Sequence, residues 1–239
     1  MNLEPVVYDC GGTTLTGYLA MPQTDRPVPG VLVAHDASGV NDHVNARTAA
    51  LAELGYAAFA LDLYGVRDIP RSEMVDRHTQ LVDTPGLFLD RARAGLHALS
   101  GQPLVDNSRM AAIGFCQGGI TVLELARANA PILAAIGFHP GYLRPKGSHD
   151  GPIAAKVLMM SGTEDPYASR EDFDTFSTEM AAKTQNWQLH LFGGVGHTFT
   201  DPAIDALALP GMAYDALADR TSWAMMRTLL EICFETQLA

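Results

Sequence analysis

Short, uninterrupted apolar runs, separated by longer helical patterns, are the feature that most constrains the fold of this chain. Residues 30–35 (GVLVAH) and 56–63 (YAAFALDL) are apolar at almost every position. A strand has this composition when both faces of its sheet are covered. Similar runs lie at 110–115, 132–138, 156–161 and 187–192. Strands that alternate with helices favour right-handed crossovers, so we predict an α/β fold with a mostly parallel central sheet and helices on both faces.

Two glycines near the amino terminus indicate a hairpin that precedes this sheet. Gly11 and Gly12 suit a turn with positive φ between predicted strands at 6–8 and 15–20. Helical periodicity supplies the remaining elements. Helices are predicted at 43–54, 86–99, 118–129, 171–183 and 217–236.

Three connectors are long enough to contribute to a functional site. They span 64–85, 139–155 and 198–212 and are rich in charged residues, proline or glycine. Long loops in a compact α/β domain often lie near such a site. No repeat and no shift in composition marks a boundary, so residues 1–239 are predicted to form a single domain.

The net charge of −11 bears on the partners of the protein. Nucleic acid and anionic membranes both require clustered lysine and arginine, so neither partner is expected. The first five residues contain no basic or apolar leader segment, and no apolar run reaches the roughly 18 residues that span a bilayer. We therefore expect a cytoplasmic protein, and the sequence leaves its oligomeric state open.

The cysteine and histidine spacings do not indicate a metal or a disulfide framework. Three cysteines are too few for a disulfide scaffold in a chain of this length. Neither H-x-x-x-H nor C-x-x-C occurs, so no metal site is expected. Cys10 beside the hairpin turn and Cys233 in the last helix are interpreted as packing residues.

The segment GFCQGG at 114–119 is the most informative motif. It lies between a predicted strand and a predicted helix and matches the nucleophile elbow G-x-S-x-G, with Cys116 in the serine position. Gly114 and Gly118 are required there because a Cβ would collide with the neighbouring strand or helix. The backbone N–H of Gln117 would point to the same place as the nucleophile and can donate to an oxyanion. The helix N-terminus would favour a thiolate.

Two other interpretations of this motif are weaker. The first is a buried cysteine in a glycine-rich turn. The second is a dinucleotide-binding turn, but that motif normally opens its fold, whereas several strands precede this one.

Two further residues complete a possible catalytic triad. Asp165 follows the strand at 156–161, and His197 follows the strand at 187–192 within a glycine-rich bend. Glu164 could replace Asp165, although the spacing from the strand favours Asp165. The order nucleophile, acid, histidine is that of α/β-hydrolases, and each residue ends a predicted parallel strand, where sites of such sheets form. We therefore predict an α/β-hydrolase fold.

These motifs together resemble the dienelactone hydrolase family of α/β-hydrolases, and the resemblance covers nearly the whole chain. The motifs are HDASGVN at 35–41, LDLYG at 61–65, GFCQGG at 114–119, SGTEDP at 161–166 and GHTF at 196–199. The resemblance implies a Cys–Asp–His triad and the hydrolysis of an ester or lactone through an acyl-enzyme, with no cofactor. The oxyanion would be held by the backbone N–H groups of Gln117 and Ala37. Tyr64 and Tyr142 are expected to contact the small-molecule substrate.

The chain departs from the family pattern at two positions. Where dienelactone hydrolases of the family have a glutamate that helps to form the thiolate, this chain has Asp36, which could assist Cys116 more weakly or could cap its loop. The family arginine that binds the substrate carboxylate, four residues after the histidine, is Asp201 here. A substitute cation would have to come from Arg67, Arg71 or Arg144.

Two alternative functions stay open at this stage. A low-pKa cysteine also suits a thiol redox sensor, or the elbow could persist in a non-catalytic scaffold, although no resolving cysteine lies near Cys116 in sequence. A cysteine amidase of the glutamine-amidotransferase type also uses an elbow. In that class the histidine and the acid lie close together in sequence, unlike Asp165 and His197.

Overall fold

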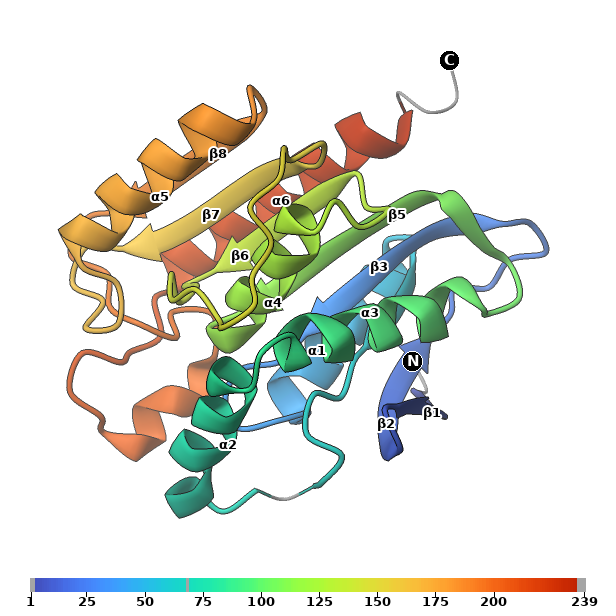
Figure 1. Ribbon diagram of the computed structural model, residues 1–239, viewed down its shortest axis with the longest axis horizontal. Coiled ribbons are helices and arrows are strands. Elements are labelled where there is room, and N and C mark those ends of the chain that lie inside the picture. Colours follow the sequence, from blue (N-terminus) through green and yellow to red (C-terminus); the bar gives the residue numbers. More distant parts are fainter. Residues whose placement is uncertain (1–2, 68, 236–239) are drawn as a thin grey trace.

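The predicted strands assemble into one eight-stranded sheet in the computed structural model of the protein (Figure 1). The strand order is β1-β2-β4-β3-β5-β6-β7-β8. The strands are β1 (Glu4–Cys10), β2 (Thr13–Ala20), β3 (Val28–Ala34), β4 (Ala57–Ala60), β5 (Val105–Phe115), β6 (Ala134–Phe138), β7 (Lys156–Gly162) and β8 (Trp187–Phe192).

The structure describes residues 3–67 and 69–235. Residues 1–2, 68 and 236–239 lie outside this description, and with them the last residue of the helix predicted at 217–236 and the ends of the predicted domain.

The sheet is mostly parallel, which confirms the prediction from the apolar runs. Strands β3 to β8 pair in parallel with one another, whereas β1 pairs antiparallel with β2, and β2 pairs antiparallel with β4. The predicted hairpin is also confirmed, because Gly11 and Gly12 form its turn with φ values of 60° and 82°. The strands between β4 and β7 are covered on both faces, as their continuous hydrophobicity requires.

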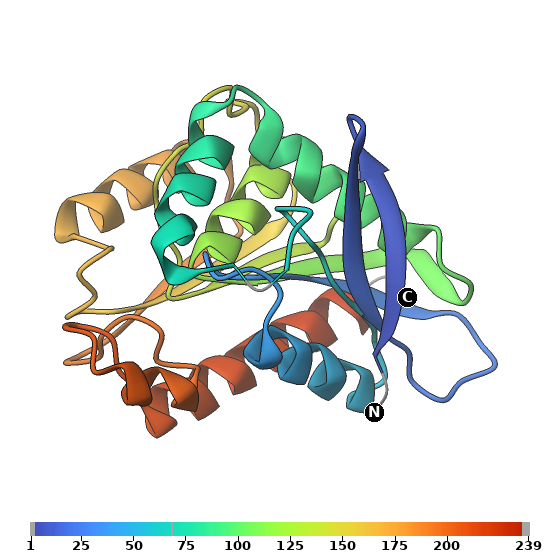
Figure 2. The same cartoon turned by 90° about the horizontal axis from the view of Figure 1, so that it is seen from below.

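Helices cover the two faces of the sheet unequally (Figure 2). Helices α1 and α6 pack on one face, and α2, α3, α4 and α5 contribute to the core on the other. No helix in the described part of the chain has both the length and the hydrophobicity that crossing a membrane requires. The helices are α1 (Asp42–Glu53), α2 (Arg71–Asp83), α3 (Leu87–Ser100), α4 (Gln117–Arg127), α5 (Arg170–Lys183) and α6 (Ala216–Glu235).

Helix α2 is an element that the sequence did not predict. It lies within the connector 64–85, and only Leu81 and Val82 of its residues are fully buried. Its inner face carries the half-buried polar residues Arg77 and His78, so the apolar repeat that marks a helix is absent. A second difference is a short 3-10 helix, η1 (Pro202–Leu207), in the connector 198–212.

A buried group of charges stabilises the contact between α4 and α5. Arg127 on α4 is 3% exposed and donates to Glu124 at 2.8 Å and to Glu179 on α5 at 2.6 Å. Burial would raise the pKa of Glu179, but Arg127 and then Lys183 lower it to about 2. Lys183 also pairs with Asp150 at 2.5 Å, so the connector 139–155 is attached to the same group of charges.

Replacing Arg127 should destabilise the protein, because two largely buried carboxylates then lose the cation that they share. We expect Arg127→Met to lower the free energy of unfolding by about 3 kcal/mol, because Glu124 and Glu179 then lose their shared cation. Urea denaturation followed by circular dichroism measures the change. The matched control is Arg227→Met, which breaks an exposed pair with Glu231 on α6 and should cost under about 0.5 kcal/mol. Equal losses in the two variants would contradict the argument.

Candidate active site

Cys116 lies in the sharp turn between β5 and α4, as predicted. Its φ of 52° and ψ of −113° are values that residues other than glycine rarely adopt. Hydrogen bonds hold the turn, since the Cys116 N–H donates to the carbonyl of Phe138 and the Cys116 carbonyl accepts from the N–H of Gly119. The half-buried Cys116 side chain therefore stands at the N-terminus of α4, the positive end of the helix dipole.

Two glycines allow this turn to pack against its neighbours. A Cβ on Gly114 would lie 2.0 Å from the carbonyl oxygen of Gly118, and a Cβ on Gly118 would lie 2.1 Å from the carbonyl oxygen of Ala34. Both distances are far inside van der Waals contact. The expectation that a side chain at either position would collide is therefore confirmed.

Asp165 and His197 meet at the same edge of the sheet. Asp165 follows β7 and His197 follows β8, and their Oδ2 and Nδ1 atoms are 2.7 Å apart. Both are buried, with 6% and 1% of their surfaces exposed. The second carboxylate oxygen of Asp165 accepts from the N–H of Tyr167, which fixes its orientation. Glu164, the alternative acid, is exposed, so the structure favours Asp165.

The electrostatics of His197 connect it to the nucleophile. Burial alone would lower the pKa of His197, but the charge of the Cys116 thiolate and the hydrogen bond to Asp165 raise it to about 10. The Nε2 atom makes no hydrogen bond of standard geometry to the described residues. The side chain is thus oriented through Nδ1, and its other nitrogen is left for an interaction with the Cys116 sulfur.

A second histidine, which the sequence analysis missed, packs against His197. The ring centroids of His139 and His197 are 5.0 Å apart in an edge-to-face arrangement, and His139 Nε2 bonds the Thr200 hydroxyl at 2.8 Å. Burial holds the pKa of His139 well below 6.5, and the charges of His197 and His43 lower it further. A signal was available, because His139 directly follows the apolar run that forms β6.

The loop after β3 is fixed by its own side chains. The Asp36 carboxylate accepts from the backbone N–H of Ser38 at 2.7 Å, from the Ser38 hydroxyl and from Asn41 at 3.2 Å. His35 contacts the Asp36 carbonyl through Nδ1, and its Nε2 accepts from the N–H of Leu63. Of the two roles expected for Asp36, these contacts correspond to the cap of its loop.

Tyr64 and Gln117 meet beside the nucleophile. The Tyr64 hydroxyl donates to Gln117 Oε1 at 2.8 Å and lies 3.3 Å from the carbonyl oxygen of Ala37. His78 on α2 contacts the same Oε1 through Nδ1 at 2.7 Å. The sequence analysis missed His78 because it did not predict the helix that carries it.

Tyr142 occupies a different environment from Tyr64. Its hydroxyl pairs with the Ser161 hydroxyl at 2.8 Å, and its ring packs edge-to-face on Phe173 and Phe176 of α5. The structure therefore places Tyr142 in the packing between the connector 139–155 and α5.

The arginines expected as possible anion-binding groups have other partners. Arg67 donates to the Thr16 carbonyl, with its guanidinium above the ring of Tyr18, and Arg144 pairs with Asp150. Arg71 is exposed at the first position of α2.

Two other charged residues, Asp201 and Arg77, also have partners outside the candidate triad. Asp201 caps η1 by accepting from the N–H of Ala203. Arg77 on α2, which the sequence analysis did not consider, pairs with Glu73 at 2.7 Å. No group of three or more potential metal ligands is found among residues 3–67 and 69–235.

Cys10 and Cys233 lie at the end of β1 and in α6, and all three cysteines are free thiols. Burial raises the pKa of both side chains, which disfavours their thiolates. Of the three thiols, only Cys116 stands in an elbow.

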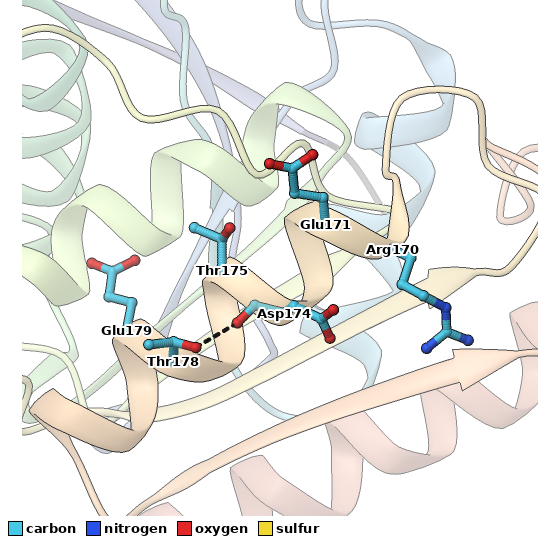
Figure 3. A pocket seen from close by; sticks show the side chains of 6 residues that line it. All are labelled: Arg170, Glu171, Asp174, Thr175, Thr178 and Glu179. Atoms are coloured by element: carbon cyan, nitrogen blue, oxygen red, sulfur yellow. Dashed lines mark hydrogen bonds between the residues drawn. The ribbon is translucent and has the colours of Figure 1, made fainter.

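A surface hollow of about 700 Å³ is separate from this site (Figure 3). It runs along α5, and none of the three candidate catalytic residues lines it. Its lining side chains are Arg170, Glu171, Asp174, Thr175, Thr178 and Glu179.

The strand order, with a nucleophile elbow after β5 and an acid and a histidine after β7 and β8, defines the class of α/β-hydrolases. Within this class the chain belongs to the dienelactone hydrolase family, whose sequence profile matches residues 15–234. The family assignment confirms the resemblance, and the protein is a hydrolase of the kind that acts on esters or lactones.

Several relatives are known at different levels of similarity. A solved structure from metagenomic libraries, described as a dienelactone hydrolase-like promiscuous phosphotriesterase, is 36% identical, covers 98% of each chain and has a TM-score of 0.93. A probable 2-oxo-3-(5-oxofuran-2-ylidene)propanoate lactonase from Bradyrhizobium is 25% identical over 89% of this chain and 87% of its own. Carboxymethylenebutenolidase 1 of Cupriavidus pinatubonensis is 27% identical over 79% and 82%.

The charge state of His197 provides a direct test of its contact with Cys116. We expect Cys116→Ala to lower the pKa of His197, because the variant removes the thiolate and leaves burial opposed only by Asp165. At about pH 8.5 the imidazole should be protonated in the unmodified protein and neutral in the variant. Histidine ¹H–¹³C NMR titration measures this change. Cys233→Ala, the matched control on α6, should leave the titration of His197 unchanged, and the same midpoint in all three proteins would refute the contact.

Proposed function

We propose that the protein hydrolyses a carboxylic ester or lactone as a single domain, through an acyl-enzyme on Cys116. The observation that carries this proposal is the strained elbow of Cys116 at the same sheet edge as the hydrogen-bonded pair of Asp165 and His197. A non-glycine residue in that backbone conformation is costly, so it persists where its side chain has a function, and the Cys116 thiol is half-buried at this edge.

The first half of the reaction forms the acyl-enzyme. In the resting enzyme His197 already holds the proton of the Cys116 thiol, in keeping with the raised pKa of His197, and the thiolate attacks the carbonyl carbon of the substrate. The negative charge that develops on the carbonyl oxygen is stabilised by the backbone N–H groups of Gln117 and Ala37. His197 then gives its proton to the departing alkoxide, and the tetrahedral intermediate collapses to a thioester.

The second half regenerates the enzyme. His197 removes a proton from water, and the resulting hydroxide attacks the thioester carbon. The tetrahedral intermediate collapses, the acid product leaves, and the Cys116 thiolate is regenerated beside the protonated His197. Asp165 keeps the imidazole in one orientation and stabilises its protonated form in both halves.

The geometry also supports a second class of substrate. The 36% identical relative is described as a promiscuous phosphotriesterase. A thiolate and a pair of N–H donors can act on a phosphoryl centre as they act on a carbonyl centre. We therefore include a neutral phosphotriester, paraoxon, beside the esters in the test of Cys116.

The proposal predicts that one cysteine of the three carries the activity. Cys116→Ala should lower kcat for p-nitrophenyl acetate by at least about a thousandfold, because the nucleophile is lost. Cys10→Ala and Cys233→Ala are the matched controls and should keep most of the activity. Iodoacetamide should label Cys116 fastest in mass spectrometry. Preferential labelling of Cys10, or a Cys116→Ala enzyme with normal turnover, would contradict the proposal and favour a redox or scaffold function.

A second prediction concerns the charge of the substrate. Arg67 and Arg144 are paired elsewhere, Arg77 is paired with Glu73, and Asp201 stands where the family arginine is expected. A substrate carboxylate would therefore lie near the negative charges of Asp36 and Asp201, which have hydrogen-bond donors but no arginine partner among the ion pairs described, in a partly desolvated site. We expect kcat/KM for the neutral methyl ester of dienelactone to exceed that for the free acid by about tenfold.

Varying the ionic strength distinguishes like-charge repulsion of the substrate carboxylate from a steric preference for the methyl ester. Added salt screens like-charge repulsion, so it should raise kcat/KM for the free acid and leave the methyl ester almost unchanged. A clear preference for the free acid would show that a cation does reach the substrate carboxylate.

A further inference from the structure

The carboxamide of Gln117 is held in place by side chains from two other parts of the chain. Its Oε1 accepts from the Tyr64 hydroxyl at 2.8 Å and contacts His78 Nδ1 at 2.7 Å. Tyr64 follows β4 and His78 lies on α2, so three separate elements meet at one amide. A side chain held from two directions cannot reorient freely, and it is therefore prepared to recognise a group at a fixed position.

The amide nitrogen of this carboxamide has no hydrogen-bond acceptor among the described residues. Gln117 is 1% exposed, and its Nε2 makes no hydrogen bond to any residue that the structure describes. A buried N–H without an acceptor destabilises a folded protein, so its retention requires an explanation. One explanation is that this N–H donates to an acceptor atom of the substrate. It fits the location, since the backbone N–H of Gln117 is itself a proposed oxyanion donor.

The Tyr64 hydroxyl that holds this amide is close to the nucleophile. Burial raises the pKa of Tyr64, and the charges of Asp36 and Cys116 raise it further. The same hydroxyl is 3.3 Å from the carbonyl oxygen of Ala37, whose N–H is the other proposed oxyanion donor. The Gln117 amide is therefore part of the surroundings of the reacting carbonyl.

The strand order decides which part of the substrate faces this amide. In the sheet, β5 carries Cys116, while β4 lies two strands away on one side and β8 lies three strands away on the other. His197 follows β8 and must face the leaving alcohol oxygen in order to protonate it. Tyr64 follows β4 and donates to Gln117, so both lie on the opposite side of Cys116 from His197, the side on which we expect the acyl part of the substrate to extend.

We propose that Gln117 Nε2 donates a hydrogen bond to an oxygen in the acyl part of the substrate, close to the scissile carbonyl. The preferred substrates are then esters or lactones with an ether, keto or ring oxygen at that position. This inference rests on the proposed function, because it assumes that Cys116 and His197 act on an ester. Gln117 would then select among esters according to whether their acyl part carries a hydrogen-bond acceptor.

A matched pair of substrates tests this proposal. p-Nitrophenyl methoxyacetate and p-nitrophenyl butanoate have the same chain length and leaving group, and they differ by an ether oxygen in place of a CH₂ group. The ratio of their kcat/KM values is measured for the unmodified enzyme and for Gln117→Met. Met keeps the backbone N–H and much of the side-chain volume but has no amide donor. Any loss common to both esters, and the greater intrinsic reactivity of the methoxyacetate, cancel when the two ratios are compared.

We expect the ratio of methoxyacetate to butanoate to fall by about tenfold in Gln117→Met, which corresponds to one neutral hydrogen bond. His78→Leu on α2 provides a second variant that does not alter the elbow. It removes one contact that holds Oε1, so the ratio should fall in the same direction by about two- to fivefold. Tyr167→Phe, an exposed residue on the His197 side, should leave the ratio unchanged.

Each outcome decides the question. An unchanged ratio in a folded Gln117→Met enzyme would overturn the proposal, and if that variant does not fold, an unchanged ratio in His78→Leu would do so. Failure of the underlying function would look different, since the unmodified enzyme would then hydrolyse neither ester, or Cys116→Ala would hydrolyse both.

Discussion

Helix α4 approaches strand β3 so closely at Gly118 that no side chain can lie between them, and the geometry of the site depends on that contact. It forces the chain to turn sharply after β5, and the turn places Cys116 in a backbone conformation that only its surroundings can maintain. The same turn presents the Gln117 N–H and the thiol on one side. Because β3 also ends at this edge, the parallel pairing of β3 with β5 brings the loop that carries Ala37 to Cys116.

Burial has opposite consequences for two neighbouring histidines. Burial lowers the pKa of His139 and keeps it uncharged, and the positive charges of His197 and His43 lower that pKa further. His197 is just as buried, yet the Cys116 thiolate and Asp165 outweigh the loss of solvation and favour its protonated form. The two rings nevertheless touch edge to face. An uncharged His139 can therefore support the ring of His197 without competing with it for a proton.

Much of the fold and the main candidates of the site could be predicted from local patterns. Continuous apolar runs identified the parallel strands, and glycine spacing identified the elbow, because a close backbone approach requires glycine whatever surrounds it. Helix α2 could not be found in this way, since its inner face carries Arg77 and His78 where an apolar repeat would be needed. For that reason His78 was not predicted, and neither was its contact with the Gln117 amide.

The sequence by itself determined the class of fold and the order along the chain of the candidate nucleophile, acid and histidine, because these depend on periodicity and on short motifs within single elements. Only the tertiary structure decided how side chains from different elements are used. It showed that Arg67 and Arg144 have other partners, that Asp36 caps its loop and that Tyr142 packs against α5. The physical reason is that hydrogen bonds and ion pairs between distant residues depend on distances that the fold sets and that no spacing along the chain encodes.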